Sequence, residues 1–205
     1  MRPDDRPVLA IILSLVALAL FDAMGLIIKH LSNSYSAAEL SAWRNLFALI
    51  PTAIVLWSSK AWQRNGRTFK LRQWKLALLR GVIVTFAQLC FYMSLGLMTF
   101  AAASTISYAS ALFITALAIP ILGERVGWVR WSAVLVGFAG VIMVVQPTSE
   151  GFNLYSLLPL SAAAFYALVS VTARLFDDAA PSSLINLYST ITATIGAAVI
   201  AYLLG

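Results

Sequence analysis

Two charged residues interrupt apolar stretches of the sequence that are long enough to cross a lipid bilayer. Asp22 lies about 14 residues into the first stretch, and Arg44 lies about 6 residues into the second. With a helical rise of about 1.5 Å per residue, both side chains are expected about 10 Å from the same membrane surface. An isolated charge at that depth costs several kcal/mol, so each needs a partner or a water-filled cavity. We predict an ion pair between Asp22 and Arg44 that either only joins two helices or also faces a substrate path.

Polar side chains in the neighbouring stretches are expected at similar depths. Ser104 and Tyr108 lie in the first turns of the fourth stretch, and a spacing of four residues places them on one helix face. Gln88 and Tyr166 are expected nearer the middle of the bilayer, where carriers built from inverted repeats bind their substrates. Such groups also hydrogen-bond between helices without contacting a ligand. The candidates for a substrate path are Asp22, Arg44, Gln88, Tyr92, Ser104, Ser107, Tyr108 and Tyr166.

The sequence offers little for catalytic or metal chemistry. It contains one histidine, His30, and one cysteine, Cys90, which are too few for the usual His/Cys metal site or Cys–His nucleophile pair. A glycine-rich phosphate-binding loop of the GxxxxGK[ST] form is absent. We therefore predict that the protein is not an enzyme and has no catalytic residues, no metal ligands and no cofactor.

The elements that must position these polar residues are membrane-spanning helices. Hydrophobic residues make up 61% of the chain and charged residues only 11%, a balance that a soluble domain of this length does not have. A membrane β-barrel would instead show alternating segments of about 10 residues. We predict an all-α, polytopic membrane helix bundle with about seven transmembrane helices. Their approximate ranges are 8–29, 38–58, 76–98, 102–122, 129–146, 155–176 and 183–204.

Basic residues occupy the N-terminus and every second connection between these stretches, and the connections between them contain no lysine or arginine. The basic positions are Arg2 and Arg6, the stretch 60–75, Arg125, Arg130 and Arg174. Because cytoplasmic loops retain such residues, the N-terminus is expected in the cytoplasm and residue 205 on the outer side of a cell (inner or plasma) membrane. The same bias accounts for the net charge of +6. The predicted partners are the lipid bilayer and a small-molecule solute, and no nucleic acid.

Several smaller features are interpreted as architectural. Trp62 and Trp74, in or beside the basic stretch, are expected to anchor the chain at the membrane interface. Arg80 is expected to extend its side chain from an apolar helix toward water. Gly137 is one of the small residues that allow a neighbouring helix to approach closely.

An offset of 145 residues relates the first two apolar stretches to the sixth and seventh. Five spans separate the copies, so the second copy is inverted relative to the first, as in many secondary transporters. The matched residues are Leu13, Leu15, Ala17 and Ala19 with Leu158, Leu160, Ala162 and Ala164, and Trp43 with Tyr188.

Residues 92–147 carry a more specific signal, with LGER at 122–125 and a GxxGV pattern at 137–141. This region resembles EamA-type carriers of the drug/metabolite transporter superfamily, and Asp22 and Arg44 agree with the resemblance. It implies a ten-helix fold of inverted repeats in which residues 1–147 are the first EamA-type repeat and residues 148–205 are two helices of the second. Glu124 and Arg125 correspond to the family's motif after helix four. The implied function is secondary transport of small organic solutes by alternating access.

The expected ten-helix pattern lacks its last three helices. We therefore expect either a fragment or truncated reading frame, or a bundle completed by a second copy or a partner chain. The alternative is an inactive or structural membrane subunit. A retinal protein is disfavoured because no lysine follows Lys75. Polar residues of the last stretch are expected on a face poorly suited to lipid, or bonded to their own helix: Asn186, Ser189, Thr190, Thr192 and Thr194.

Overall fold

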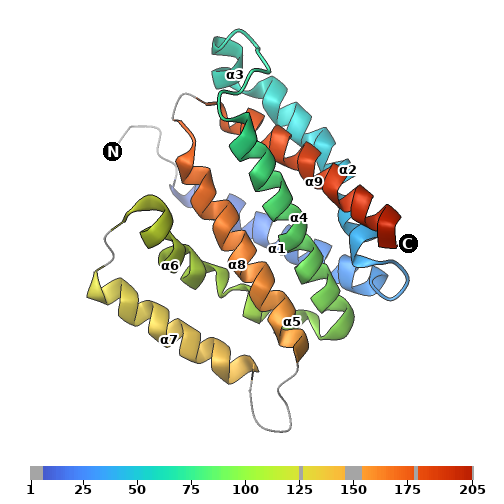
Figure 1. Cartoon of the computed structure of the whole chain (residues 1–205), viewed down its shortest axis with the longest axis vertical. Helices are drawn as coiled ribbons and strands as arrows, with labels where there is room; N and C mark the ends of the chain where they lie inside the picture. Colours follow the sequence, from blue (N-terminus) through green and yellow to red (C-terminus); the bar gives the residue numbers. More distant parts are fainter. Residues whose placement is uncertain (1–6, 125–126, 146–153, 178–179, 205) are drawn as a thin grey trace.

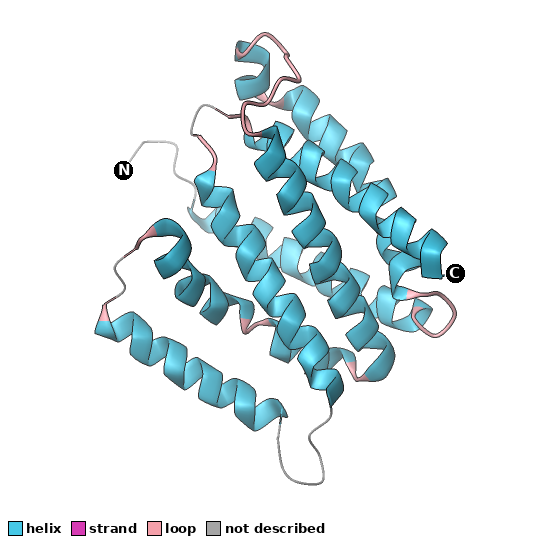
Figure 2. Ribbon diagram, in the orientation of Figure 1, coloured by secondary structure: helices cyan, strands magenta, loops and turns pink. Residues whose placement is uncertain are grey.

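The computed structural model describes residues 7–124, 127–145, 154–177 and 180–204, and in these ranges it contains helices and no strand (Figure 2). The α-helices are α1 (Pro7–Leu31), α2 (Ala37–Ser58), α3 (Lys60–Arg64), α4 (Trp74–Leu97), α5 (Phe100–Ser107), α6 (Ser110–Leu122), α7 (Trp128–Val145), α8 (Leu157–Thr172) and α9 (Ser182–Leu204). Two short 3-10 helices, η1 (Leu154–Ser156) and η2 (Ala173–Leu175), flank α8.

The predicted membrane helix bundle is confirmed. Within the described residues, six helical spans are long and apolar enough to cross a membrane, with Phe100–Leu122 counted as one span. A shorter apolar helix covers Trp128–Met143. The chain is therefore a multi-pass membrane protein.

Local sequence fixes where several helices begin and end. The Ser36 hydroxyl accepts a hydrogen bond from the Glu39 amide at 3.2 Å, while the Glu39 carboxylate accepts one from the Ser36 amide at 2.8 Å. This reciprocal capping box satisfies amide groups at the start of α2. An example of a helix end is Gly123, which terminates α6. Its φ of 67° is a left-handed conformation that glycine adopts without steric cost.

The helices form two sides around a central pair. Helices α4 and α8 lie at the centre, with α2 and α9 packed together on one side and α6 and α7 on the other (Figure 1). The most extensive contacts join α2 to α9, α4 to both α8 and α9, and α6 to α8. Helix α1 contacts α4 and α5 over a small area, and most of its side chains are exposed.

Helices α4 and α9 approach closely because Gly81 lies between them. A Cβ atom at this position would lie 2.5 Å from the Cβ of Thr192 and 2.7 Å from the Ser189 carbonyl oxygen. The contact therefore excludes any side chain at residue 81.

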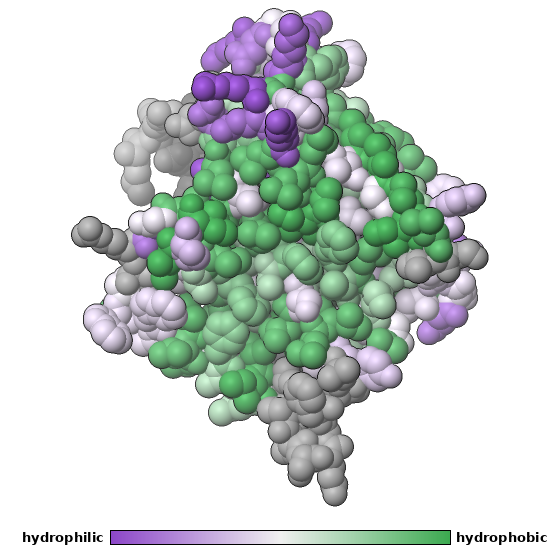
Figure 3. Space-filling model, viewed as in Figure 1, coloured by the Kyte–Doolittle hydropathy of each residue, from purple (hydrophilic) through white to green (hydrophobic). Residues whose placement is uncertain are grey.

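The segment between α2 and α4 folds back onto the first turn of α9. Trp62 is only 2% exposed, and its indole N–H donates to the Thr68 carbonyl at 3.0 Å. It packs in a buried cluster that includes Leu56 and Leu184. The prediction that Trp62 anchors the chain at the membrane interface is therefore wrong, whereas Trp74 is exposed as expected. Figure 3 shows hydrophilic residues gathered over this α3 end and a broad hydrophobic face below it.

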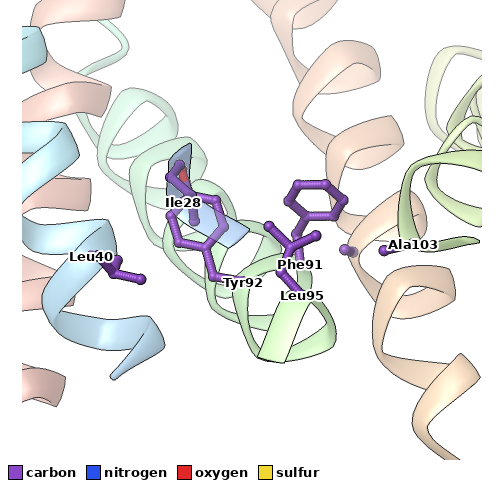
Figure 4. Packing of buried hydrophobic residues seen from close by; sticks show 7 residues of the cluster. Ile28, Leu40, Phe91, Tyr92, Leu95 and Ala103 are labelled. Carbon is purple, nitrogen blue, oxygen red and sulfur yellow. The ribbon is translucent and has the colours of Figure 1, made fainter. Parts of the chain in front are cut away.

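A second buried cluster joins α1, α2, α4, α5 and α8 at the opposite end of the bundle. Ile28 of α1, Leu40 of α2 and Leu95 of α4 are among its members (Figure 4). Beside them, the Lys29 ammonium donates hydrogen bonds to the Leu95 carbonyl and, at 3.0 Å, to the Met98 carbonyl. A cation at the C-terminus of α4 is favourable because the last carbonyls of a helix carry partial negative charge.

Candidate solute-binding cavities

The fourth span is broken into two helices where its polar residues are concentrated. Tyr108 and Ala109 separate α5 from α6, and the Ala109 amide donates to the Ile106 carbonyl at 3.0 Å, a tightened 3-10 turn. The sequence predicted one continuous helix over 102–122. Discontinuous helices often border the binding sites of secondary transporters.

A pocket of about 310 Å³ lies beside this break, and we call it the Asp22 pocket. Its walls are mostly apolar, but a carboxylate and several hydroxyl groups reach it. The Ser107 hydroxyl is buried and has no hydrogen-bond partner among the described residues, so it is free to bind a ligand. The lining residues are Phe21, Asp22, Phe91, Ser104, Ser107, Tyr108, Ser110 and Tyr166.

A second cavity, of about 270 Å³, lies between α2, α4, α8 and α9, and we call it the arginine cavity. Two guanidinium groups contribute to its lining, one from α2 and one from α4. Its polar lining residues are Arg44, Asn45, Arg80, Gln88, Tyr166, Asn186, Ser189 and Thr190.

Gln88 joins α4 to α2 at one end of the arginine cavity. Its side-chain oxygen accepts hydrogen bonds from the Ser41 hydroxyl at 2.8 Å and the Asn45 amide at 2.7 Å. Its own amide donates to the Asn45 oxygen at 3.1 Å. All three side chains are at least 96% buried, so each needs these partners. Gln88 therefore has a structural role beside the cavity that it lines.

Arg80 joins α4 to α8 and α9 at the other end. Its guanidinium donates to the Asn186 oxygen at 3.2 Å, the Ser189 hydroxyl at 3.3 Å and the Val169 carbonyl at 3.5 Å. Arg80 was expected to extend toward water, and the structure adds that neighbouring helices supply acceptors for its guanidinium. Asn186, which is exposed, and Ser189, which is buried, are thus both bonded to Arg80.

Two threonines of α9 bond to their own helix, which was the second of the two expectations for this face. Thr192 donates to the Tyr188 carbonyl at 2.9 Å, and Thr194 donates to the Thr190 carbonyl at 2.7 Å. Such bonds to the preceding turn satisfy a hydroxyl without a second helix.

The predicted ion pair between Asp22 and Arg44 is not formed. Among the described residues Asp22 makes no ion pair, and the Arg44 guanidinium donates instead to the Asn45 oxygen at 3.3 Å. The reason is that α1 packs on α4 and α5, whereas α2 packs on α9 and α4. The two charges therefore line different cavities, and Tyr166 lines both.

Three other predicted residues lie elsewhere. Tyr92 is buried in the cluster of Figure 4 and lines neither cavity. Glu124 forms an ion pair with Arg174 at 3.0 Å. Arg125 lies outside the described residues.

Sequence reasoning missed part of the arginine cavity. Arg80, Val84 and Gln88 recur at intervals of four residues and all line it. That spacing places them on one side of α4, so the position of Gln88 could have identified Arg80. The contributions of Asn186, Ser189 and Thr190 depend on the packing of α9, which no local signal reveals.

Comparison with known proteins identifies the family to which the sequence belongs. A model of the EamA-like transporter family matches residues 8–146. The chain belongs to the EamA-like transporter family. This EamA-like chain is 27% identical over 166 residues to an S-adenosylmethionine uptake transporter of Rickettsia bellii, covering 80% of the chain and 54% of the relative.

Two further relatives of the EamA-like chain are also named as transporters. A pseudopaline exporter, CntI, of Pseudomonas aeruginosa is 24% identical over 165 residues, covering 80% of the chain and 56% of the relative. A riboflavin transporter of Vibrio cholerae is 42% identical over 65 residues, covering 31% of the chain and 22% of the relative. The chain spans about half the length of the first of these relatives. No solved structure matches it.

Proposed function

We propose that the chain acts in the secondary transport of small organic solutes by alternating access. The observation that carries the proposal is the pair of cavities that are both lined by Tyr166, in a chain that shares a family with named transporters. One cavity offers a carboxylate and the other offers guanidinium groups, so a path through both would present charged and hydroxyl groups to a solute within an apolar bundle. Membrane interiors tolerate such charges chiefly where they serve transport.

Equivalent positions of α2 and α9 support an inverted repeat. At the offset of 145 residues, Arg44 corresponds to Ser189 and Asn45 to Thr190, and all four line the arginine cavity. Two related helices thus present corresponding positions to one site, as expected when a substrate binds at the interface between repeats.

Contacts between the basic connections support the proposed orientation, with the α3 end in the cytoplasm. Arg72, in the connection before α4, pairs with Asp177 at 3.7 Å in the connection before α9. Arg174 of that same connection pairs with Glu124, after α6. The contacts bring connections rich in basic residues to one end of the bundle, as a common cytoplasmic side requires.

Solute flux in proteoliposomes tests the proposal. The 205-residue chain is compared with a chimera in which the corresponding C-terminal part of the Rickettsia bellii relative follows residue 205, using a metabolite mixture that contains S-adenosylmethionine and riboflavin. Flux in the short chain would mean that it forms a working site, alone or with a second copy. Flux only in the chimera would mean that further helices are needed. Absence of flux in both, with correct insertion, would favour the alternative of a structural or inactive subunit.

A further inference from the structure

We infer that the arginine cavity binds the carboxylate or phosphate group of a soluble organic anion. This inference rests on the proposed transport function and names the chemical class of its solute. Arg44 and Arg80 both line the cavity, and the described residues that line it include no aspartate or glutamate. Two guanidinium groups thus face one space of about 270 Å³ without a carboxylate to balance them.

The acidic residues that the structure describes are committed elsewhere. Glu39 caps the start of α2 through Ser36. Glu124 and Asp177 pair with arginines in the exposed connections. Asp22 lines the other pocket, beyond Tyr166. The described part of the chain therefore supplies no internal counter-ion to the arginine cavity.

The hydrogen bonds of the two arginines leave their charges uncompensated. Among the described residues, Arg80 donates to three neutral oxygens, of Asn186, Ser189 and Val169. Arg44 donates to the Asn45 oxygen, which also accepts from Gln88. The Arg44 Nε atom is buried and has no partner among the described residues. Both arginines are half-buried. An unbalanced cation in such a position is unfavourable, and an oxyanion would balance the charge while accepting hydrogen bonds from the remaining donor positions.

The chemistry of the lining favours an oxyanion over a halide or a neutral solute. A guanidinium presents its N–H groups in a planar fork that matches two oxygens of a carboxylate or phosphate. Thr190 and Ser189 add hydroxyl groups at the same cavity. The cavity is just below the range of about 300–1,000 Å³ typical of small-molecule sites, which suits one charged group of a larger solute.

Protection of arginine from phenylglyoxal tests the inference without requiring transport. The 205-residue chain is placed in phosphatidylcholine nanodiscs, and mass spectrometry follows modification of Arg44, Arg80 and the exposed Arg67 at constant ionic strength. The probes are benzoate, phenyl phosphate and the neutral benzamide. We expect benzoate or phenyl phosphate to slow modification of Arg44 and Arg80 about tenfold at about ten times its dissociation constant. Benzamide should not protect, and Arg67 should be modified at an unchanged rate.

Variants and lipid composition make the result specific. Arg44→Gln should abolish the protection of Arg80, whereas Arg67→Gln should leave it intact. Equal protection by benzamide, equal protection of Arg67, or no reaction of Arg44 under any condition would overturn the inference. Protection by added phosphatidylglycerol but by neither soluble anion would also overturn it, because the anion would then be a lipid headgroup.

The outcome is independent of the flux experiment. Protection without flux would support the oxyanion site while contradicting transport by this chain. Flux that is equally fast for organic anions and for their neutral analogues, without protection, would support transport and contradict the site.

Discussion

The two sides of the bundle differ in how firmly their cavities are built. The arginine cavity lies among α2, α4, α8 and α9, where a glycine contact and hydrogen-bonded polar side chains join the helices. The Asp22 pocket lies among α1, α4, α5, α6 and α8, and of these helices α1 is mostly exposed and packs on its neighbours over a small area. We therefore expect stability to be concentrated around the arginine cavity, and we expect residues of the Asp22 pocket to be replaceable at little structural cost.

The largest expected effect on stability comes from a substitution at the close contact between α4 and α9. Gly81→Val should destabilise the protein by about 3 kcal/mol, because its Cβ would overlap Thr192 and the Ser189 carbonyl and force α4 and α9 apart. The matched control is Gly96→Val on the same helix, where nothing lies within 4 Å of the added Cβ. The free energy of unfolding is measured by SDS titration in mixed micelles. Equal effects at both positions would mean that α4 and α9 do not pack as described.

A smaller effect is expected from the polar network. Gln88→Leu keeps the side-chain volume similar but leaves Ser41 and Asn45 buried without their partner, which should cost about 2 kcal/mol in the same assay. Ser104→Ala, on the side of the Asp22 pocket, should change stability by less than about 0.5 kcal/mol. A Gln88→Leu protein as stable as the unmodified chain would contradict the contrast between the two sides.

The smallest effect on stability is expected at Asp22, and it sharpens the comparison by separating folding from function. Asp22 is exposed at its pocket and forms no ion pair with the described residues, so Asp22→Asn should change the free energy of unfolding by less than about 0.5 kcal/mol. Solute flux should nevertheless be lost in whichever protein transports solute, the 205-residue chain or the chimera. Asp177→Asn, an exposed aspartate outside both cavities, should preserve stability and flux. A large loss of stability in Asp22→Asn would show that its carboxylate is structural.

The helical spans follow from the sequence because the thickness of a bilayer sets their length. The expected ranges 38–58 and 183–204 agree closely with α2 (Ala37–Ser58) and α9 (Ser182–Leu204). The break at Tyr108 was not expected, because Ser, Thr and Tyr occur in continuous and broken membrane helices alike.

Residue counting predicts the depth of the candidate residues in the membrane, but it does not predict the direction in which their side chains point. Residue counting placed Asp22 and Arg44 at similar depths, yet it does not give the rotation of each helix or its neighbours, so the expected ion pair was wrong. The prediction for Trp62 was wrong for a related reason, because the loop that carries it folds back onto residues distant in sequence. Tyr166 was recognised from its depth alone, and both cavities use it.

The bond between Lys29 and the end of α4 has a consequence for biogenesis. Its two carbonyl acceptors lie 66 and 69 residues later in the chain, so Lys29 leaves the ribosome before either acceptor is made. Because Lys29 is near the end of α1, its ammonium can remain hydrated at the membrane surface until α4 arrives. A lysine near the middle of the same helix would instead be exposed to lipid without a partner until α4 is inserted. The position of this cation therefore suits a chain that is inserted one helix at a time.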